Sequence, residues 1–210
     1  MGHGLDPAPT NDLGFGIIVD DGTSPRTELP TPGPVGMESG GGSTNKSSAS
    51  IAQEVMTFAT QRMGTQHDDG QCFTLVDHAL KKAGAKSAAD FGKVTEDADY
   101  VWGKAVKLSD AKPGDLIQFR DYSYQRTIKT TNSDGSWSEA DDKEGRPHHT
   151  AIVEQVNGDG SLVVLEQNAH KGDPVARNTL FFKSGTTESG NTKTTITVQG
   201  TVRFYRPQAR

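Results

Sequence analysis

Hydrophobic and polar positions along the chain predict two amphipathic helices between residues 50 and 84. Four apolar residues of the first helix share one face at helical spacing: Ile51, Val55, Phe58 and Ala59. Ser50 is its predicted N-cap and Gly64 its predicted stop. A second helix is predicted to begin at Cys72 and to end at Gly84. Its apolar stripe consists of Leu75, Val76, Ala79 and Leu80.

After the second helix the apolar period shortens to that of strands. The apolar runs 149–156 and 162–168 are joined by an Asn-Gly-Asp-Gly sequence, which is a strong hairpin signal. Further strands are expected at 116–120, 180–182, 195–198 and 202–205. Residues 121–147 predict a polar insertion with a turn at 132–136, and the charges at 140–145 predict a solvated loop. Two helices followed by about five antiparallel strands predict an α+β domain, with the helices packed against a curled sheet.

Residues 1–49 have the composition of a linker. They hold six of the ten prolines, followed by a Gly- and Ser-rich stretch, so we predict a disordered tail before a folded domain at 50–210. Two interpretations of the short apolar segment 13–19 stay open: a β-prone patch within the tail, which the glycines favour, and a docking strand. The proline-rich segment 30–34 can adopt polyproline geometry and would then offer a ligand for a partner domain.

Composition excludes several classes of function. The formal net charge is −5 and no dense Lys/Arg cluster is present, which argues against nucleic-acid binding. No run of 18 apolar residues is present, so no membrane insertion is expected. The N-terminus lacks a secretory signal, and a single cysteine excludes an internal disulfide framework. The compartment stays open, and a secreted or translocated effector is compatible with the sequence.

The one cysteine, Cys72, lies at a predicted helix N-terminus, where the helix dipole favours a thiolate. His149 begins the first strand of the predicted hairpin, and Glu166 ends the second. Because side chains alternate along strands, the hairpin brings His149 opposite residues 166–168. The carboxylate can then orient one ring nitrogen while the other faces the thiol. These residues predict a cysteine nucleophile with its base and orienting acid.

The segments that carry this chemistry resemble a known family. They are Gly-Gln-Cys at 70–72, Lys-Pro-Gly-Asp-Leu-Ile at 112–117, His-Thr-Ala-Ile-Val at 149–153 and Glu-Gln-Asn at 166–168. Together they look like the CHAP family of cysteine, histidine-dependent amidohydrolases and peptidases, relatives of the NlpC/P60 group. The resemblance spans roughly residues 50–170 and implies a papain-like fold.

The resemblance implies roles for individual residues. Cys72 would be the nucleophile, His149 the general base and Glu166 the orienting acid of an acyl-enzyme mechanism. Gln71 would help to form the oxyanion hole, and Asn168 would be an accessory polar group. The implied activity is an amidase (N-acetylmuramoyl-L-alanine amidase) or peptidase acting on peptidoglycan peptides of the cell wall, without metal or organic cofactor. Many relatives carry an acidic residue at the position of Thr74.

Other interpretations of the same residues stay open. Trp102 and His148 are candidates for the wall of the substrate cleft, and His148 is a second candidate for the base. A zinc site involving His148, His149, His170 and Asp173 is disfavoured because the spacing contains no short ligand motif. Glu166 could instead pair with an arginine. Two alternatives to a wall hydrolase remain: a cysteine protease acting on a protein substrate, and a non-catalytic interaction module. Relatives of the fold also occur at the ends of fungal actin-patch adaptor proteins.

Overall fold

The computed structural model of the protein describes residues 18–19 and 46–210. Most of the predicted tail, including its proline-rich segment, lies outside these residues. Ile18 and Val19 form a short strand, β1 (Ile18–Val19), parallel to Thr201 and Val202 of the last strand. For these two residues the docking-strand interpretation is therefore the one that the structure has, and the favoured β-prone patch was wrong.

The first helix, α1 (Ser48–Thr60), buries the four residues that its period predicts: Ile51, Val55, Phe58 and Ala59. The predicted N-cap, Ser50, was wrong. The Ser47 hydroxyl accepts a hydrogen bond from the backbone N–H of Ser50 at 3.2 Å and caps the helix instead. The helix ends at Thr60, before the predicted stop at Gly64, which adopts a positive φ of 75° in the following turn.

The second helix, α2 (Cys72–Lys82), begins at the cysteine, as predicted. Its buried residues include the whole predicted stripe of Leu75, Val76, Ala79 and Leu80. Lys81 and Lys82 occupy the last turn, where positive charge complements the helix dipole. Gly84 follows at a φ of 72°, a conformation that favours glycine and ends the helix. Cys72 thus stands at the positive end of a well-terminated helix.

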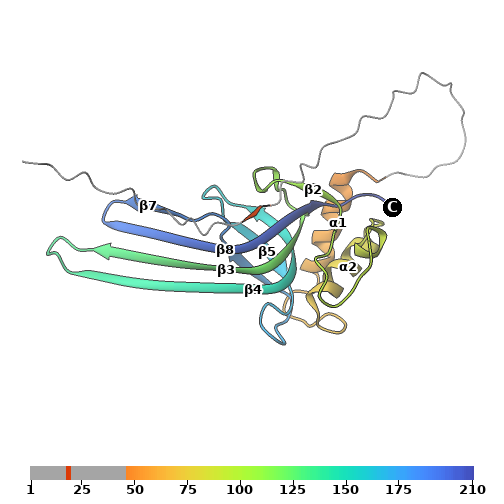
Figure 1. The fold of residues 1–210 in the computed structure, drawn as a ribbon, viewed down its shortest axis with the longest axis horizontal. Coiled ribbons are helices and arrows are strands. Elements are labelled where there is room, and N and C mark those ends of the chain that lie inside the picture. Colours follow the sequence, from red (N-terminus) through yellow and green to blue (C-terminus); the bar gives the residue numbers. More distant parts are fainter. Residues whose placement is uncertain (1–17, 20–45) are drawn as a thin grey trace, which may run out of the picture.

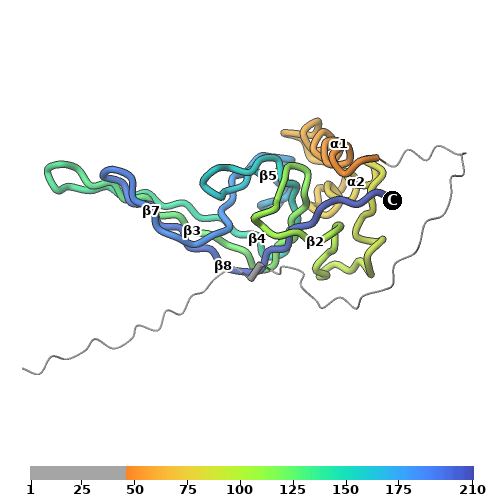
Figure 2. Tube along the Cα trace, turned by 90° about the horizontal axis from the view of Figure 1, so that it is seen from above, coloured from red at the N-terminus to blue at the C-terminus, as the bar shows by residue number. Residues whose placement is uncertain are grey.

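The strands form one curled sheet beside the two helices (Figures 1 and 2). Among the described residues the order is β1-β8-β3-β4-β5-β6, with β2 and β7 also paired to β8. Every pairing except that of β1 is antiparallel. The bounds are β2 (Lys104–Val106), β3 (Leu116–Thr131), β4 (Trp137–Val156), β5 (Leu162–Glu166), β6 (Ala176–Leu180), β7 (Gly185–Ser189) and β8 (Thr192–Arg206). The architecture is the predicted α+β arrangement.

The sheet extends into an arm that projects away from the helices (Figure 1). The prediction of a polar insertion at 121–147 with a solvated loop at 140–145 was wrong, because β3 and β4 pair continuously from Tyr122 with Arg146 to Thr131 with Trp137. Tyr122 and Tyr124 still belong to the apolar core, and polar contacts link the strands beyond them. Arg126 pairs with Asp142, and the Thr127 hydroxyl donates to Asp141 at 2.5 Å. The turn at 132–136 is present as predicted.

A bulge separates the arm from the body of the sheet. The β3–β8 register shifts between Arg120 and Ser123, and Asp121 adopts a φ of 54°. On the partner strand Gly200 has a φ of 96°, and a Cβ built there would lie 2.3 Å from the Asp121 carbonyl oxygen. Only glycine fits this close approach, so the bend between the body and the arm requires the glycine at position 200.

Two apolar layers cover the two faces of the curled sheet. The layer between helices and sheet contains Leu75, Val76, Leu80, Trp102, Leu116 and Ile152. The layer inside the curl contains Ile117, Phe119, Ala151, Val153, Val164 and Phe204. His149 shares the face of Ala151 and Val153, as its period-2 position predicts. The helix N-terminus and this strand meet at the boundary of the two layers.

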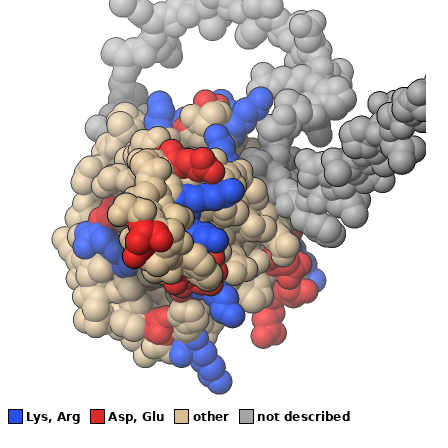
Figure 3. Space-filling view, turned by 90° about the vertical axis from the view of Figure 1, so that its left-hand side faces the viewer, with Lys and Arg blue, Asp and Glu red and all other residues tan. Residues whose placement is uncertain are grey.

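The surface of the arm carries charges of both signs. Seen from its tip, Lys/Arg and Asp/Glu side chains are interspersed (Figure 3). Arg126 with Asp142 and Lys193 with Glu188 are two of the pairs. No helix among residues 18–19 and 46–210 is long and apolar enough to cross a membrane.

Candidate active site

The loop before α2 aims Cys72 into a cleft. Gly70 adopts a φ of 77°, and a Cβ at this position would collide with the Gln66 side chain. Gln71 is the N-cap residue, but its side chain makes no capping hydrogen bond to the helix. The first N–H groups of α2 are therefore not covered by a capping side chain, and that of Phe73 faces the Cys72 sulfur. The helix start is receptive to negative charge.

The Cys72 thiol is activated by its surroundings. Burial alone would raise its pKa, but a hydrogen bond with His149 and the charge of that ring outweigh burial. Backbone N–H groups of Thr150 and Phe73 add further donors. The result is a pKa below the ordinary value of a cysteine, which increases the thiolate fraction near neutral pH.

His149 connects the thiol to a buried carboxylate. Its Nε2 lies 2.9 Å from Glu166 Oε2, although the direction falls outside hydrogen-bond geometry. This contact leaves Nδ1 to face Cys72. Burial lowers the pKa of His149, but the hydrogen bond with Cys72 and the contact with Glu166 outweigh it and raise the pKa to about 9. A thiolate–imidazolium pair is the protonation state that these contacts favour.

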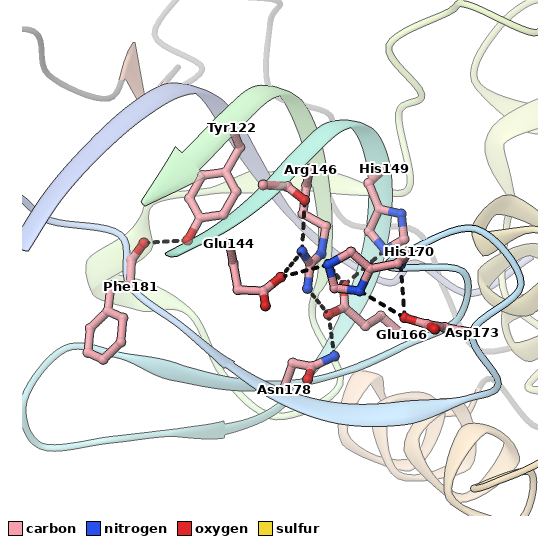
Figure 4. Close-up of polar contacts among 10 residues, drawn as sticks. Tyr122, Glu144, Arg146, His149, Glu166, His170, Asp173, Asn178 and Phe181 are labelled. Carbon is pink, nitrogen blue, oxygen red and sulfur yellow. Dashed lines mark hydrogen bonds and ion pairs between the residues drawn. The ribbon is translucent and has the colours of Figure 1, made fainter. Parts of the chain in front are cut away.

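Glu166 also pairs with an arginine, so the two interpretations of this residue are not exclusive. Arg146 is 1% exposed, and its Nε and Nη2 donate to the Glu166 carboxylate at 3.0 and 2.6 Å (Figure 4). Asn178 donates to the same carboxylate at 2.8 Å. Burial would raise the pKa of Glu166, but His149 and Arg146 lower it to about 2. The carboxylate thus stays ionised inside the curl.

A chain of polar contacts continues from Arg146 toward the surface. Arg146 Nη1 donates to Glu144 at 2.8 Å, and Glu144 lies 3.4 Å from the exposed His170 ring (Figure 4). His170 also contacts Asp173. Sequence reasoning did not assign Arg146 a role in the site, because the signal is only one arginine three residues before the histidine. Strand alternation was not enough to place it, since 146 and 149 differ in parity.

Gln167 positions the loop before the nucleophile, and sequence reasoning missed it. Its Oε1 accepts from the His67 N–H at 2.6 Å, and its Nε2 donates to the carbonyl groups of His67 and Gln71 at 3.1 and 3.2 Å. Gln167 is fully buried. The position between Glu166 and Asn168 was a visible signal, but a partner about a hundred residues away is not readable from spacing. This side chain fixes the distance between the hairpin and the loop that bears the thiol.

The two accessory residues lie beside the thiol. Gln71 and Asn168 both line the cleft, and Asn168 Nδ2 donates to Gln71 Oε1 at 3.4 Å. With its oxygen engaged, the Gln71 amide keeps its NH₂ group available as a donor. Asn168 adopts a φ of 62° and accepts from the Gly172 N–H at 2.8 Å. Both residues are therefore held at the mouth of the site.

The cleft has a volume of about 330 Å³. Cys72, His149 and His148 line it. The His148 ring contacts the Ala98 carbonyl at 2.8 Å and lies tilted against the Tyr100 ring, with 5.5 Å between the ring centroids. His148 is thus part of the wall, and His149 is the histidine that contacts the thiol. The expectation for Trp102 was wrong: it is fully buried and hydrogen-bonded to Gln118 beneath the cleft. Tyr100, its neighbour at period 2, takes the place in the wall.

The Lys-Pro-Gly-Asp segment at 112–115 supports the fold rather than the chemistry. Asp115 is 2% exposed and accepts two hydrogen bonds from Arg206 at 3.0 and 2.9 Å. The Gly114 N–H donates to the Val153 carbonyl, and a Cβ at Gly114 would collide with Ala52 of α1. The segment therefore fixes the entry of β3 against β4 and α1.

The disfavoured zinc site is not assembled in the described part of the chain. No group of three or more His, Cys, Asp or Glu side chains there is arranged to hold a metal ion. His149 is directed to Cys72 and Glu166, whereas His170 and Asp173 contact each other at the surface. These side chains therefore belong to two separate clusters.

A comparison with protein families matches residues 43–210 to the AIM3/BBC1 cysteine proteinase-fold domain. The matched range contains both helices and every strand except β1. It supports the papain-like fold expected from the sequence, while the matched model is not that of the CHAP or NlpC/P60 group. Neither the comparison with curated proteins nor that with solved structures gave a match.

Proposed function

Because the chain belongs to the family of AIM3/BBC1 cysteine proteinase-fold domains, we propose that it is a cysteine hydrolase of amide bonds. Cys72 is the nucleophile, His149 the general base and acid, and Glu166 the residue that orients the imidazole. Function cannot be taken from the fold alone, so the proposal rests on the site itself.

One observation carries the proposal: the Cys72 thiol and the His149 ring interact and line the same cleft, and Glu166 lies 2.9 Å from His149 Nε2. The pKa of the thiol is lowered and that of the imidazole is raised, which is the pattern expected of an ion pair poised for nucleophilic attack. A structural cysteine buried in apolar packing would have a raised pKa instead.

The chemistry follows from this pair. The thiolate attacks the carbonyl carbon, and the tetrahedral oxyanion is met by the Cys72 N–H and the Gln71 amide. Loss of one such donor costs roughly 10²–10³ in rate. As the C–N bond breaks, the His149 imidazolium gives its proton to the leaving amine, and an acyl-enzyme thioester remains. His149 then takes a proton from water, whose oxygen attacks the thioester. The C–S bond breaks, the acyl group leaves as a carboxylic acid, and the thiolate–imidazolium pair is restored.

Peptides are the substrate class that we propose. The family description, a cysteine proteinase fold, favours an amide bond in a polypeptide. Peptidoglycan peptides are the narrower class that the CHAP resemblance implies. The two classes share the same scissile group, so the catalytic residues would serve either one, and the cleft decides between them.

The test is hydrolysis by the purified chain. A peptide library and purified peptidoglycan are incubated with wild type, Cys72→Ala and His149→Asn, and products are separated by mass spectrometry. New amine and carboxyl termini with wild type alone would support the proposal. Cleavage of the library peptides without release of peptidoglycan fragments would identify polypeptides as the substrate class. Absence of products in both arms, with a thiol that alkylates like free cysteine, would contradict the proposal.

A non-catalytic interaction module is the second candidate function. One observation favours it: the direction between His149 Nε2 and Glu166 misses hydrogen-bond geometry, so the imidazole is not held as firmly as in a preformed triad. In that case wild type and Cys72→Ala would bind a partner equally well, and neither would cleave any amide.

A further inference from the structure

Apart from the Cys72–His149 pair itself, the charged side chains that line the cleft are acidic. Asp69 and Glu96 line it, and no lysine or arginine does so among the described residues. The Asp69 carboxylate accepts from the Gln71 N–H at 2.9 Å and the Thr74 hydroxyl at 3.0 Å, which are neutral donors. Its negative charge is therefore held in place without being cancelled by a cation.

Glu96 differs from the acidic residues that follow it. Arg120 pairs with Asp97 and Asp99, and Arg203 pairs with Asp99 as well. No lysine or arginine in the described part of the chain contacts the Glu96 carboxylate. Glu96 is exposed and lines the cleft. Its backbone carbonyl accepts a hydrogen bond from the Tyr100 hydroxyl. Its carboxylate thus adds a negative charge to the cleft lining that no lysine or arginine of the described residues contacts.

An aromatic wall leads from the thiol toward Glu96. The Phe73 and Tyr100 rings lie 4.7 Å apart, and Tyr100 lies 5.5 Å from His148. Tyr100 lines the cleft, and its hydroxyl donates to the Glu96 backbone carbonyl at 3.4 Å. The methylene stem of a long side chain can pack on such a wall while its charged end stays in water near a carboxylate.

We propose, on the premise that the site hydrolyses amides, that the cleft selects peptides with a lysine or arginine beside the scissile bond. Glu96 is the specificity-determining residue: it pairs with the cationic end, while Phe73 and Tyr100 carry the stem. Asp69 adds a second negative charge to the lining of the same cleft. Neutral and acidic side chains at this position lose the pairing or meet repulsion.

The experiment compares three fluorogenic peptides that are identical except for arginine, citrulline or glutamate at one position next to the scissile amide. Citrulline keeps the shape of arginine without its charge. We expect kcat/KM to fall in the order arginine, citrulline, glutamate, with about threefold to tenfold between the first two, as for an exposed ion pair supported by an aromatic face. The preference should weaken as ionic strength rises.

Glu96→Gln should bring the arginine-to-citrulline ratio of kcat/KM close to one. The matched control is Glu139→Gln, an exposed glutamate on the arm, which changes the net charge equally and should leave the ratio unchanged. Binding of the same peptides to Cys72→Ala by calorimetry gives a readout that does not need turnover.

Equal kcat/KM for arginine and citrulline, or an unchanged ratio in Glu96→Gln, would overturn the specificity and leave the hydrolase intact. Absence of hydrolysis for all three peptides would count against the hydrolase. Cys72→Ala would then decide the recognition separately: tighter binding of the arginine peptide supports it, and equal affinities overturn it.

Discussion

At the scale of single residues, the reactivity of Cys72 depends on a carboxylate that it does not touch. Glu166 contacts His149 and is held by Arg146 inside the curl of the sheet. A buried carboxylate without a cation would take up a proton and could no longer stabilise an imidazolium. Arg146 keeps it ionised at every pH at which the thiol would work. The line of polar contacts that ends at Cys72 therefore includes Arg146 as well as the three residues predicted from the sequence.

Arg146→Gln is expected to lower the free energy of unfolding by about 3–5 kcal/mol, because it leaves the Glu166 charge buried without this partner. Arg146→Lys should retain part of the stability, since one cation replaces a bidentate pair. Urea unfolding measures both. The control is Arg126→Gln, which removes the partly exposed pair with Asp142 and should cost at most about 1 kcal/mol. Equal losses at 146 and 126 would contradict this account.

At the scale of elements, the sequence predicts best what apolar period controls. Both helices, their buried stripes and the pairing of the 149–156 and 162–168 segments follow from periodicity, although the register shift between Val153 and Gln155 does not. The hairpin brings His149 to Glu166. The arm was missed because its strands are held by polar pairs such as Arg126 with Asp142, which have no apolar alternation. Gln167 was missed because its partners lie on a loop far away in sequence. Contacts between distant polar groups cannot be read from local spacing.

Gln167→Ala should loosen the loop before the nucleophile. It removes a donor and an acceptor for the His67 and Gln71 backbone, which costs about 1–3 kcal/mol for each group left buried without a partner. A thiol displaced by about 1 Å can lose roughly 10²-fold in kcat. Gln155→Ala is the matched control, since Gln155 is exposed and its side chain donates to Asn157. An unchanged kcat in Gln167→Ala would show that the loop before Cys72 keeps its position without the Gln167 side chain.

Gly200→Ala tests the bend between the arm and the body of the sheet. A methyl group would meet the Asp121 carbonyl at 2.3 Å in a backbone conformation with a φ of 96°. We expect a loss of stability of more than about 1 kcal/mol, measured by thermal or urea unfolding. Gly185→Ala on β7 is the control, because nothing lies within 4 Å of its Cβ position and no strained φ is present. Equal losses of stability in the two variants would mean that the bend at the bulge does not depend on Gly200.

At the scale of the whole molecule, pH acts through groups that were brought together from distant parts of the chain. The pKa of Glu166 is lowered to about 2, so its ionised form adds stability that is present above the ordinary carboxyl value near 4.5 and lost as pH falls toward 2. Cys72 and His149 shift in opposite directions. Between the two pKa values the folded pair holds one proton on His149, and the unfolded pair holds one proton on Cys72. Folding then takes up and releases no proton at this pair, so the two shifts offset each other in the pH dependence of stability.

The acid side is therefore the informative range for stability. Urea unfolding of wild type should show a steeper loss of free energy between about pH 4.5 and 2.5 than Glu166→Gln, which has no carboxyl to protonate at this site. The variant will be less stable overall, so the comparison uses the slope with pH rather than the absolute value. Superimposable slopes would mean that Glu166 is not held ionised by its neighbours.

The central claim is that Cys72 and His149 form an activated pair, and the rate of iodoacetamide labelling against pH tests it most directly. An ordinary cysteine reaches half of its maximal labelling rate at about pH 8.5. Wild type should reach half of its maximal rate well below that pH. His149→Asn should move this midpoint upward, because the hydrogen bond and the charge that lower the pKa of the thiol are gone. Midpoints near 8.5 for both proteins, with the fold intact by circular dichroism, would contradict the account.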